Sequence, residues 1–282
     1  MPSLSELYIL FEKLLLCEST VVLAKSPQLC FEFVSAAKDL IRPVPYAGIV
    51  RPYVIMQSDF VAMGIDGGGT PRPILIGITN PFLLKRIVAS VEQSGRNRPH
   101  VIYLNDSGEA LDVVPLKPRR SQRHQKSLPG LDMPGAMDWN HPPKKHIKSD
   151  STFMKELDAL VRRDGGTSEE VGPLVRRHFA ELSAQFLSPV HRYLATKMSS
   201  SVISPGGNLQ YANFSETEFI KSLSKHGTSV NFRGQNPIQR HKARDALYSL
   251  FCRSPNFYSW LDMKLSLEKE ASAGLLSQTA VK

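Results

Sequence analysis

The chain has 282 residues and a formal net charge of +9, and 41% of its residues are hydrophobic. This length allows one large domain or two smaller ones, and the apolar content is too high for a wholly disordered chain. The three cysteines are far apart and include no CxxC pair, which argues against a disulfide scaffold and a cysteine metal site. The longest apolar stretch, Leu7–Cys17, is much shorter than the roughly 20 residues that span a bilayer, and it lacks the basic start of a signal peptide. We therefore expect a soluble, cytoplasmic protein.

Residues 1–112 alternate between helical and extended patterns. Leu4–Leu16 is apolar nearly all round, which is typical of a buried helix, and the β-branched run Thr20–Ala24 predicts a strand. Ser26-Pro27 then offers an N-cap followed by a first-turn proline, and Asn80-Pro81 does the same for a second helix. Three further extended runs are Gly48–Met56, Pro73–Thr79 and His100–Asp106. Because the strands are apolar throughout, this half predicts an α/β sandwich with a mostly parallel sheet covered on both faces.

Residues 113–150 form a basic, proline-rich stretch. Between Pro115 and Lys148 there are eight Lys and Arg against two Asp, a net charge of +6, together with six prolines. Frequent prolines remove backbone donors and prevent helix or sheet from propagating, so we expect a disordered linker. A solvated linker is the plain interpretation; clustered cations also suit nucleic acid, an acidic protein or an acidic membrane surface. Of these partners we predict the acidic membrane surface and expect no specific nucleic acid.

Residues 151–270 change to a helical period. The apolar stripes are Phe153–Val161, Val175–Tyr193, Phe219–Leu223, Ala243–Phe251 and Phe257–Leu267. Pro189 lies inside the longest stripe and predicts a kink there. Ser215 with Glu218 predicts a capping box, and Gly227 predicts the end of that helix. The predicted fold class is therefore α/β plus all-α, with a helical region that precedes a tail at residues 271–282.

The glycine-rich string GIDGGGT, Gly64–Thr70, is the one motif that suggests phosphate chemistry. It resembles the first phosphate loop of the sugar-kinase, actin and heat-shock ATPase superfamily. Pro71 and Pro73 follow at once, however, and remove two amide donors where the second strand of that loop would begin. A glycine-rich loop is the favoured interpretation. Phosphoryl transfer stays a minor alternative.

The remaining titratable residues predict no chemistry. His178 and His191 are thirteen residues apart on the long helical stripe, too far to share a metal ion, and we expect them on its polar face. His124, His141 and His146 lie in the linker without a carboxylate or thiol spaced to complete a metal site. The sequence thus predicts no catalytic residue, no metal site and no cofactor.

Five strings, in this order, carry a specific family resemblance. They are STVVLAKSPQLCFEFVSAAKDLIRP, IVRPYVIMQSDF, ILIGITNPFLLK, VRRHFAELSAQFLSPVHRYLA and FCRSPNFYSWLDMK. The first three resemble the central DENN module with its RPY and G-x-T-N-P-F signatures. The last two resemble the helical downstream region of DENN-domain-containing protein, type six. The resemblance extends from about Leu7 to about Lys264.

The resemblance implies guanine-nucleotide exchange on a Rab GTPase in endosomal recycling traffic. Such a factor is not an enzyme that makes or breaks covalent bonds; it binds the nucleotide-free GTPase and displaces its switch regions. The family also has an N-terminal longin-like lobe, which this chain is expected to lack. A non-catalytic Rab-binding or scaffold protein is therefore the alternative. The implied location is cytoplasmic, peripheral to recycling endosomes.

Four residues match the family signatures and are the predicted partner-binding residues. Arg51 and Tyr53 belong to the RPY match, and Asn80 and Phe82 to the TNPF match. Each also has a structural interpretation, since Arg51 could satisfy a helix end and Asn80 could cap the helix that follows it. Loops beyond the carboxyl ends of parallel strands are nevertheless where partner sites gather in α/β proteins.

Overall fold

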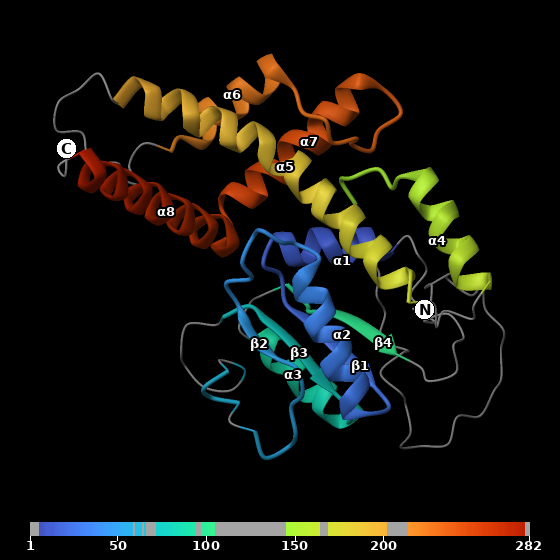
Figure 1. Cartoon of the computed structure of the whole chain (residues 1–282). Coiled ribbons are helices and arrows are strands. Elements are labelled where there is room, and N and C mark those ends of the chain that lie inside the picture. Colours follow the sequence, from blue (N-terminus) through green and yellow to red (C-terminus); the bar gives the residue numbers. More distant parts are fainter. Residues whose placement is uncertain are drawn as a thin grey trace.

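A four-stranded parallel sheet forms the first half of the computed structural model (Figure 1). The structure describes residues 6–58, 60–63, 65, 72–93, 97–104, 145–163, 169–201 and 214–279. The strands are β1 (Thr20–Ala24), β2 (Ile49–Arg51), β3 (Ile74–Ile78) and β4 (His100–Leu104), in the order β2-β3-β1-β4. Every pairing between them is parallel, with Thr20 opposite both Leu75 and His100. The predicted parallel sheet is confirmed.

Two helices cover opposite faces of this sheet. Successive strand residues point to opposite sides, so Val22 packs in a core cluster with α2 (Pro27–Asp39) and Val21 in a second cluster with α3 (Pro81–Gln93). Both helices begin as predicted. Ser26 Oγ accepts from Leu29 N at 3.3 Å, and each helix starts with its proline, which has no N–H left to satisfy.

The extended run predicted at Gly48–Met56 pairs in the sheet only as far as Arg51. Pro52 has no N–H for the ladder, and the chain turns across the neighbouring strand, where Val54 N donates to Gly77 O at 2.8 Å. A Cβ at Gly77 would lie 2.2 Å from Pro52 O, so only glycine permits this crossing. The sheet is therefore short at its β2 edge, and the chain leaves it at the carboxyl end.

Six further helices lie in the described part of the chain. They are α1 (Glu6–Leu15), α4 (Ser151–Arg163), α5 (Val171–Ser201), α6 (Glu216–His226), α7 (Pro237–Cys252) and α8 (Pro255–Thr279). Figure 1 shows α1 between the sheet and the helical region, and one hydrophobic cluster includes the α2 face of the sheet, α1 and the helices α4 to α8. No helix in the described part of the chain is both long and apolar enough to cross a membrane.

A buried asparagine ties these parts together by hydrogen bonds. Asn256, at the start of α8, is fully buried; its Nδ2 donates to Leu14 O at 2.7 Å and to Leu15 O at 3.2 Å. Its Oδ1 accepts from Ala47 N at 2.7 Å, just before β2. One side chain thereby joins α8, the end of α1 and the approach to the sheet.

Two local predictions for the helical region need correction. Ser215 caps α6 and Gly227 ends it with φ of 70°, but Glu218 does not complete the capping box, because its carboxylate accepts from Tyr193 Oη at 3.2 Å. His178 does not lie on a polar face either. It stacks on Phe153 with ring centroids 3.7 Å apart and is half-buried. The tertiary neighbours of both side chains come from other helices, so local spacing could not reveal them.

The end of the predicted linker is packed in the structure. Ile147 is buried and forms an antiparallel bridge with Phe232, and residues 145–150 lead directly into α4. Residues 113–144 lie outside the described residues, as does GIDGGGT apart from Ile65. Helix α8 continues to Thr279, into the predicted tail. The predicted domain boundaries stay a prediction; the packing adds that residues 145–150 contact both halves.

Candidate functional site

The four predicted partner-binding residues meet at the carboxyl ends of two adjacent strands. Arg51 is the last residue of β2, which pairs with β3, and Asn80 follows β3 by two residues. A hydrogen bond of 3.1 Å between Tyr53 Oη and Thr79 Oγ1 links the two signature segments directly. Segments that are far apart in sequence therefore form one edge, as expected for parallel strands that end at the same side of a sheet.

One of the signature side chains at this edge has a structural role, and others are exposed to solvent. Asn80 Oδ1 accepts from Phe82 N at 2.9 Å, so Asn80 caps α3 as its structural interpretation predicts. Arg51 satisfies no helix end; its guanidinium donates to the adjacent Val50 O at 3.3 Å and is otherwise directed to solvent. Phe82 is 73% exposed, although a phenylalanine gains most when it is buried. Fold stability alone does not explain Phe82.

Further apolar side chains are exposed beside these residues. We define the edge patch as Tyr53, Ile55, Met56, Val61 and Phe82, all of them exposed large hydrophobic residues. The segment between β2 and β3, which contains Val61, contacts α3. The ring of the neighbouring Phe60 lies 4.4 Å from the guanidinium of Arg86, which is one helical turn from Phe82. Several exposed apolar side chains on neighbouring segments are typical of interaction sites in soluble proteins.

Basic groups border the edge patch. Lys85 Nζ lies 5.9 Å from the centre of the Phe82 ring, and the Arg51 and Arg86 side chains are exposed nearby on β2 and α3. An apolar centre with a cationic rim fits a protein partner that presents apolar side chains flanked by carboxylates. The described residues of this edge include no general base, nucleophile or phosphate cradle.

The described residues supply no alternative chemistry elsewhere. Among them, no group of three or more His, Cys, Asp or Glu side chains could hold a metal ion. All three cysteines are buried, and burial raises the pKa of Cys17 to about 11 and also raises the pKa of Cys30 and Cys252. Thiols held in the protonated form are poor nucleophiles at neutral pH.

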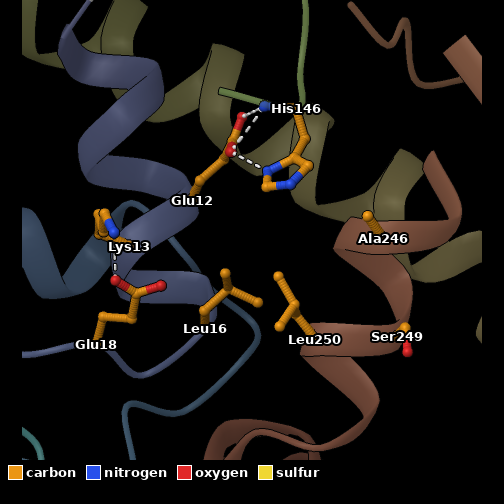
Figure 2. Close-up of a pocket in the computed structure, with 8 residues that line it drawn as sticks. All are labelled: Glu12, Lys13, Leu16, Glu18, His146, Ala246, Ser249 and Leu250. Carbon is orange, nitrogen blue, oxygen red and sulfur yellow. Dashed lines mark hydrogen bonds and ion pairs between the residues drawn. The ribbon is translucent and has the colours of Figure 1, made fainter. Parts of the chain in front are cut away.

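A cavity of about 440 Å³ lies between α1, the end of the linker and α7 (Figure 2). Figure 2 shows Leu16 and Leu250 pointing toward one another across it. Its charged groups are already paired: Lys13 with Glu18, and the buried Glu12 with the backbone and ring of His146. This internal pairing leaves no acid or base directed at a substrate.

The sequence did not single out Glu12, which nevertheless organises the junction. Its Oε1 accepts from Ile147 N at 2.7 Å and from His146 N at 3.0 Å, and its Oε2 lies 3.0 Å from His146 Nδ1. One carboxylate therefore satisfies two buried backbone N–H groups as the linker enters the helical region. The sequence did contain an indication, because a glutamate in the middle of a helix that is buried nearly all round requires a partner.

Comparison with known proteins agrees with the family signatures. The chain is 29% identical over 277 residues to the protein DENND6A of Gallus gallus, which covers 97% of this chain and 43% of that protein. It is 27% identical over 278 residues to the protein DENND6B of Homo sapiens, covering 95% of this chain and 43% of the relative. The chain is similar to the DENND6 proteins. This confirms the resemblance to DENN-domain-containing protein, type six.

The similarity to DENND6 proteins extends beyond vertebrates. The chain is 23% identical over 297 residues to the DENND6 homolog of Dictyostelium discoideum. No family model matches the chain. It spans about two fifths of the length of the curated DENND6 relatives that it matches.

Proposed function

We propose that the edge patch binds the switch regions of a Rab GTPase and that the chain takes part in DENN-type guanine-nucleotide exchange. The observation that supports the proposal is the position of the family signature residues: Tyr53 and Phe82 follow adjacent strands at one edge of the sheet, and both are exposed, as are Ile55, Met56 and Val61. The proposed setting is the cytoplasmic face of recycling endosomes, as the DENN resemblance implies.

Exchange of this kind requires binding energy and no covalent step. A factor that binds the empty GTPase more tightly than the loaded form weakens nucleotide binding by the same factor. Nucleotide held at picomolar affinity represents roughly 16 kcal/mol, so the contacts with the switch regions must supply a large differential term. Exposed aromatic residues are suited to supply such binding energy at a protein interface.

Phe82→Ala tests the proposal most directly. Because Phe82 is exposed, its removal leaves the core of the protein intact. Loss of an aromatic anchor at an interface costs about 2 kcal/mol or more, so affinity for nucleotide-free Rab should fall roughly 30-fold. Tyr258→Ala on α8 removes another exposed aromatic ring, outside the edge patch, and is the matched control.

The experiment uses a panel of Rab proteins, each either nucleotide-free or loaded with fluorescent GDP. Binding to the empty form of one Rab, faster GDP release, and loss of both in Phe82→Ala alone are the expected results. Binding without faster release would favour the scaffold alternative. If no Rab in either form binds, or if Phe82→Ala behaves like the wild type, the edge patch is not the Rab site.

A further inference from the structure

A second basic segment lies within the described helical region, apart from the linker. Phe219–Arg244 contains six Lys and Arg residues, two histidines and no Asp or Glu. Arg244 is buried and bonded to Asp245 and Ser224, which is a structural role. The remaining cations of the segment are exposed, around the turn that joins α6 to α7. Figure 1 shows this turn at the side of the helical region that is remote from the sheet.

The turn presents an apolar residue among these cations. Every residue from 233 to 242 is exposed, and Ile238 is 67% exposed in the first turn of α7. The turn is held in shape by its own polar groups. Asn236 Oδ1 accepts from Gln239 N at 2.8 Å, and Arg240 Nε donates to Gly234 O at 3.2 Å. Ile238 is therefore displayed on an ordered turn.

Helix stability does not account for the cations of this turn. Lys225 and His226 lie in the last turn of α6, where they favourably face the negative end of the helix dipole. Arg240, His241 and Lys242 instead follow the start of α7, where the dipole is positive and no acidic residue balances it. Cations at that end oppose the dipole. The dipole therefore gives no reason for cations here, and exposed cations around an apolar side chain suit a negatively charged surface.

The end of the linker adds to the same basic surface. Lys148 N donates to Asn231 O at 2.8 Å, and Arg233 N donates to His146 O at 2.7 Å. These bonds place Lys145 beside Arg233. Burial and the Arg233 charge lower the pKa of Lys145, whereas the charges of Glu6 and Glu12 raise it. The exposed Lys148 and Arg233 extend the basic surface toward the end of the linker.

We propose that this surface, the basic tip formed by Arg233, Ile238, Arg240, His241 and Lys242, docks on an anionic membrane. The cations would meet lipid headgroup phosphates while Ile238 enters the boundary between headgroups and acyl chains. The exposed isoleucine favours a membrane over a nucleic acid, because surfaces that bind single strands present aromatic side chains for base stacking. Residues 233–242 contain no Phe, Tyr or Trp. The proposal does not depend on Rab binding.

Two variants separate charge from insertion. Arg233→Gln with Lys242→Gln removes two exposed cations without altering the linker, and Ile238→Ser removes the apolar group. The matched control is Lys38→Gln with Lys155→Gln, on α2 and α4, which makes the same change in net charge at exposed positions outside the basic tip. Thermal melting verifies that all variants are folded.

The assay is co-sedimentation of the full chain with vesicles of phosphatidylcholine alone or with phosphatidylserine, at low and high salt. We expect phosphatidylserine-dependent binding that is weakened by salt. The charge variant should lose roughly 30-fold in affinity, since each cation contributes about 1 kcal/mol, or about fivefold, near such a surface. Ile238→Ser should weaken binding at both salt concentrations.

Several results would overturn the proposal. Absence of vesicle binding, or a charge variant that binds like the wild type, would exclude the basic tip as the docking surface and would leave the linker as the only basic candidate. Equal losses in the charge variant and its control would indicate net charge alone. If the charge variant binds a labelled single-stranded RNA more weakly than the wild type does, but binds vesicles equally well, the ligand is nucleic acid. If Ile238→Ser binds vesicles as strongly as the wild type does, Ile238 does not insert into the membrane.

Discussion

Replacing Glu12 tests whether one buried carboxylate fastens the linker end to the rest of the fold. Glu12 is 3% exposed and accepts hydrogen bonds from the backbone N–H groups of His146 and Ile147. In Glu12→Ala both N–H groups lose their acceptor inside the structure. An unsatisfied buried donor costs about 1–3 kcal/mol, so the variant should lose about 2–6 kcal/mol of unfolding free energy.

Glu12→Gln refines the same test because it preserves shape while removing charge. One amide oxygen can still accept from the two backbone N–H groups, whereas the amide nitrogen takes the place of Oε2, which is 3.0 Å from both His146 N and His146 Nδ1. The change exchanges charge-assisted hydrogen bonds for neutral ones and should cost about 1 kcal/mol. Glu18→Gln is the control, since Glu18 lines the same cavity but forms a partly exposed ion pair with Lys13 (Figure 2). That pair should contribute less than about 1 kcal/mol.

Thermal melting and amide hydrogen exchange provide the readouts. A loss of 1 kcal/mol lowers the melting temperature by about 2–4 °C in chains of this size class, so Glu12→Ala should melt at least roughly 5 °C below the wild type. The Ile147 amide should lose protection in the same variant, and so should Arg233, whose N–H bonds to His146 O. A melting temperature within 1 °C of the wild type, or an equal effect of Glu18→Gln, would refute the role given to Glu12.

Three further changes test the fold at separate points. Gly77→Ala should prevent stable folding, measured by circular dichroism, because its Cβ would lie 2.2 Å from Pro52 O. Burial, and secondarily Lys13, lowers the pKa of His100 to about 4, so protonation should favour the unfolded state and reduce stability as the pH falls from about 6.5 to 4. In His100→Asn that part of the pH dependence of the melting temperature should disappear. Ser215→Ala should cost about 1 kcal/mol in denaturant titrations and Glu218→Gln less, since only Ser215 caps α6.

The sequence predicted the local features well because their causes are local. Ser26-Pro27 and Asn80-Pro81 specify helix starts through groups within three residues, and the apolar runs specify strands in which both faces are covered. Adjacency of the two signature segments also followed, since parallel strands end at one edge. The exposure of Phe82 could not be predicted, because a helix pattern does not show which side lacks a covering element.

The features that the sequence concealed depend on contacts between distant segments. Glu12 and His146 are 134 positions apart, and no periodicity joins them. The basic tip was concealed differently: the proline-rich linker carried the more obvious charge, and a count of cations does not show which are exposed together. The exposure of Ile238 in the first turn of α7 is known only from the structure.

The two proposed surfaces belong to one packed body, and this bears on how they could act together. Tyr8 and Phe11 of α1 pack on Phe179 of α5 with ring centroids 5.4 and 5.3 Å apart, in the same cluster that reaches the α2 face of the sheet. Asn256 adds buried hydrogen bonds from α8 to both sides of this junction. Helices α6 and α7, which flank the basic tip, are packed in this same cluster. A membrane bound at the tip would therefore fix the orientation of the edge patch, so that a membrane-anchored GTPase meets it within a limited range of directions.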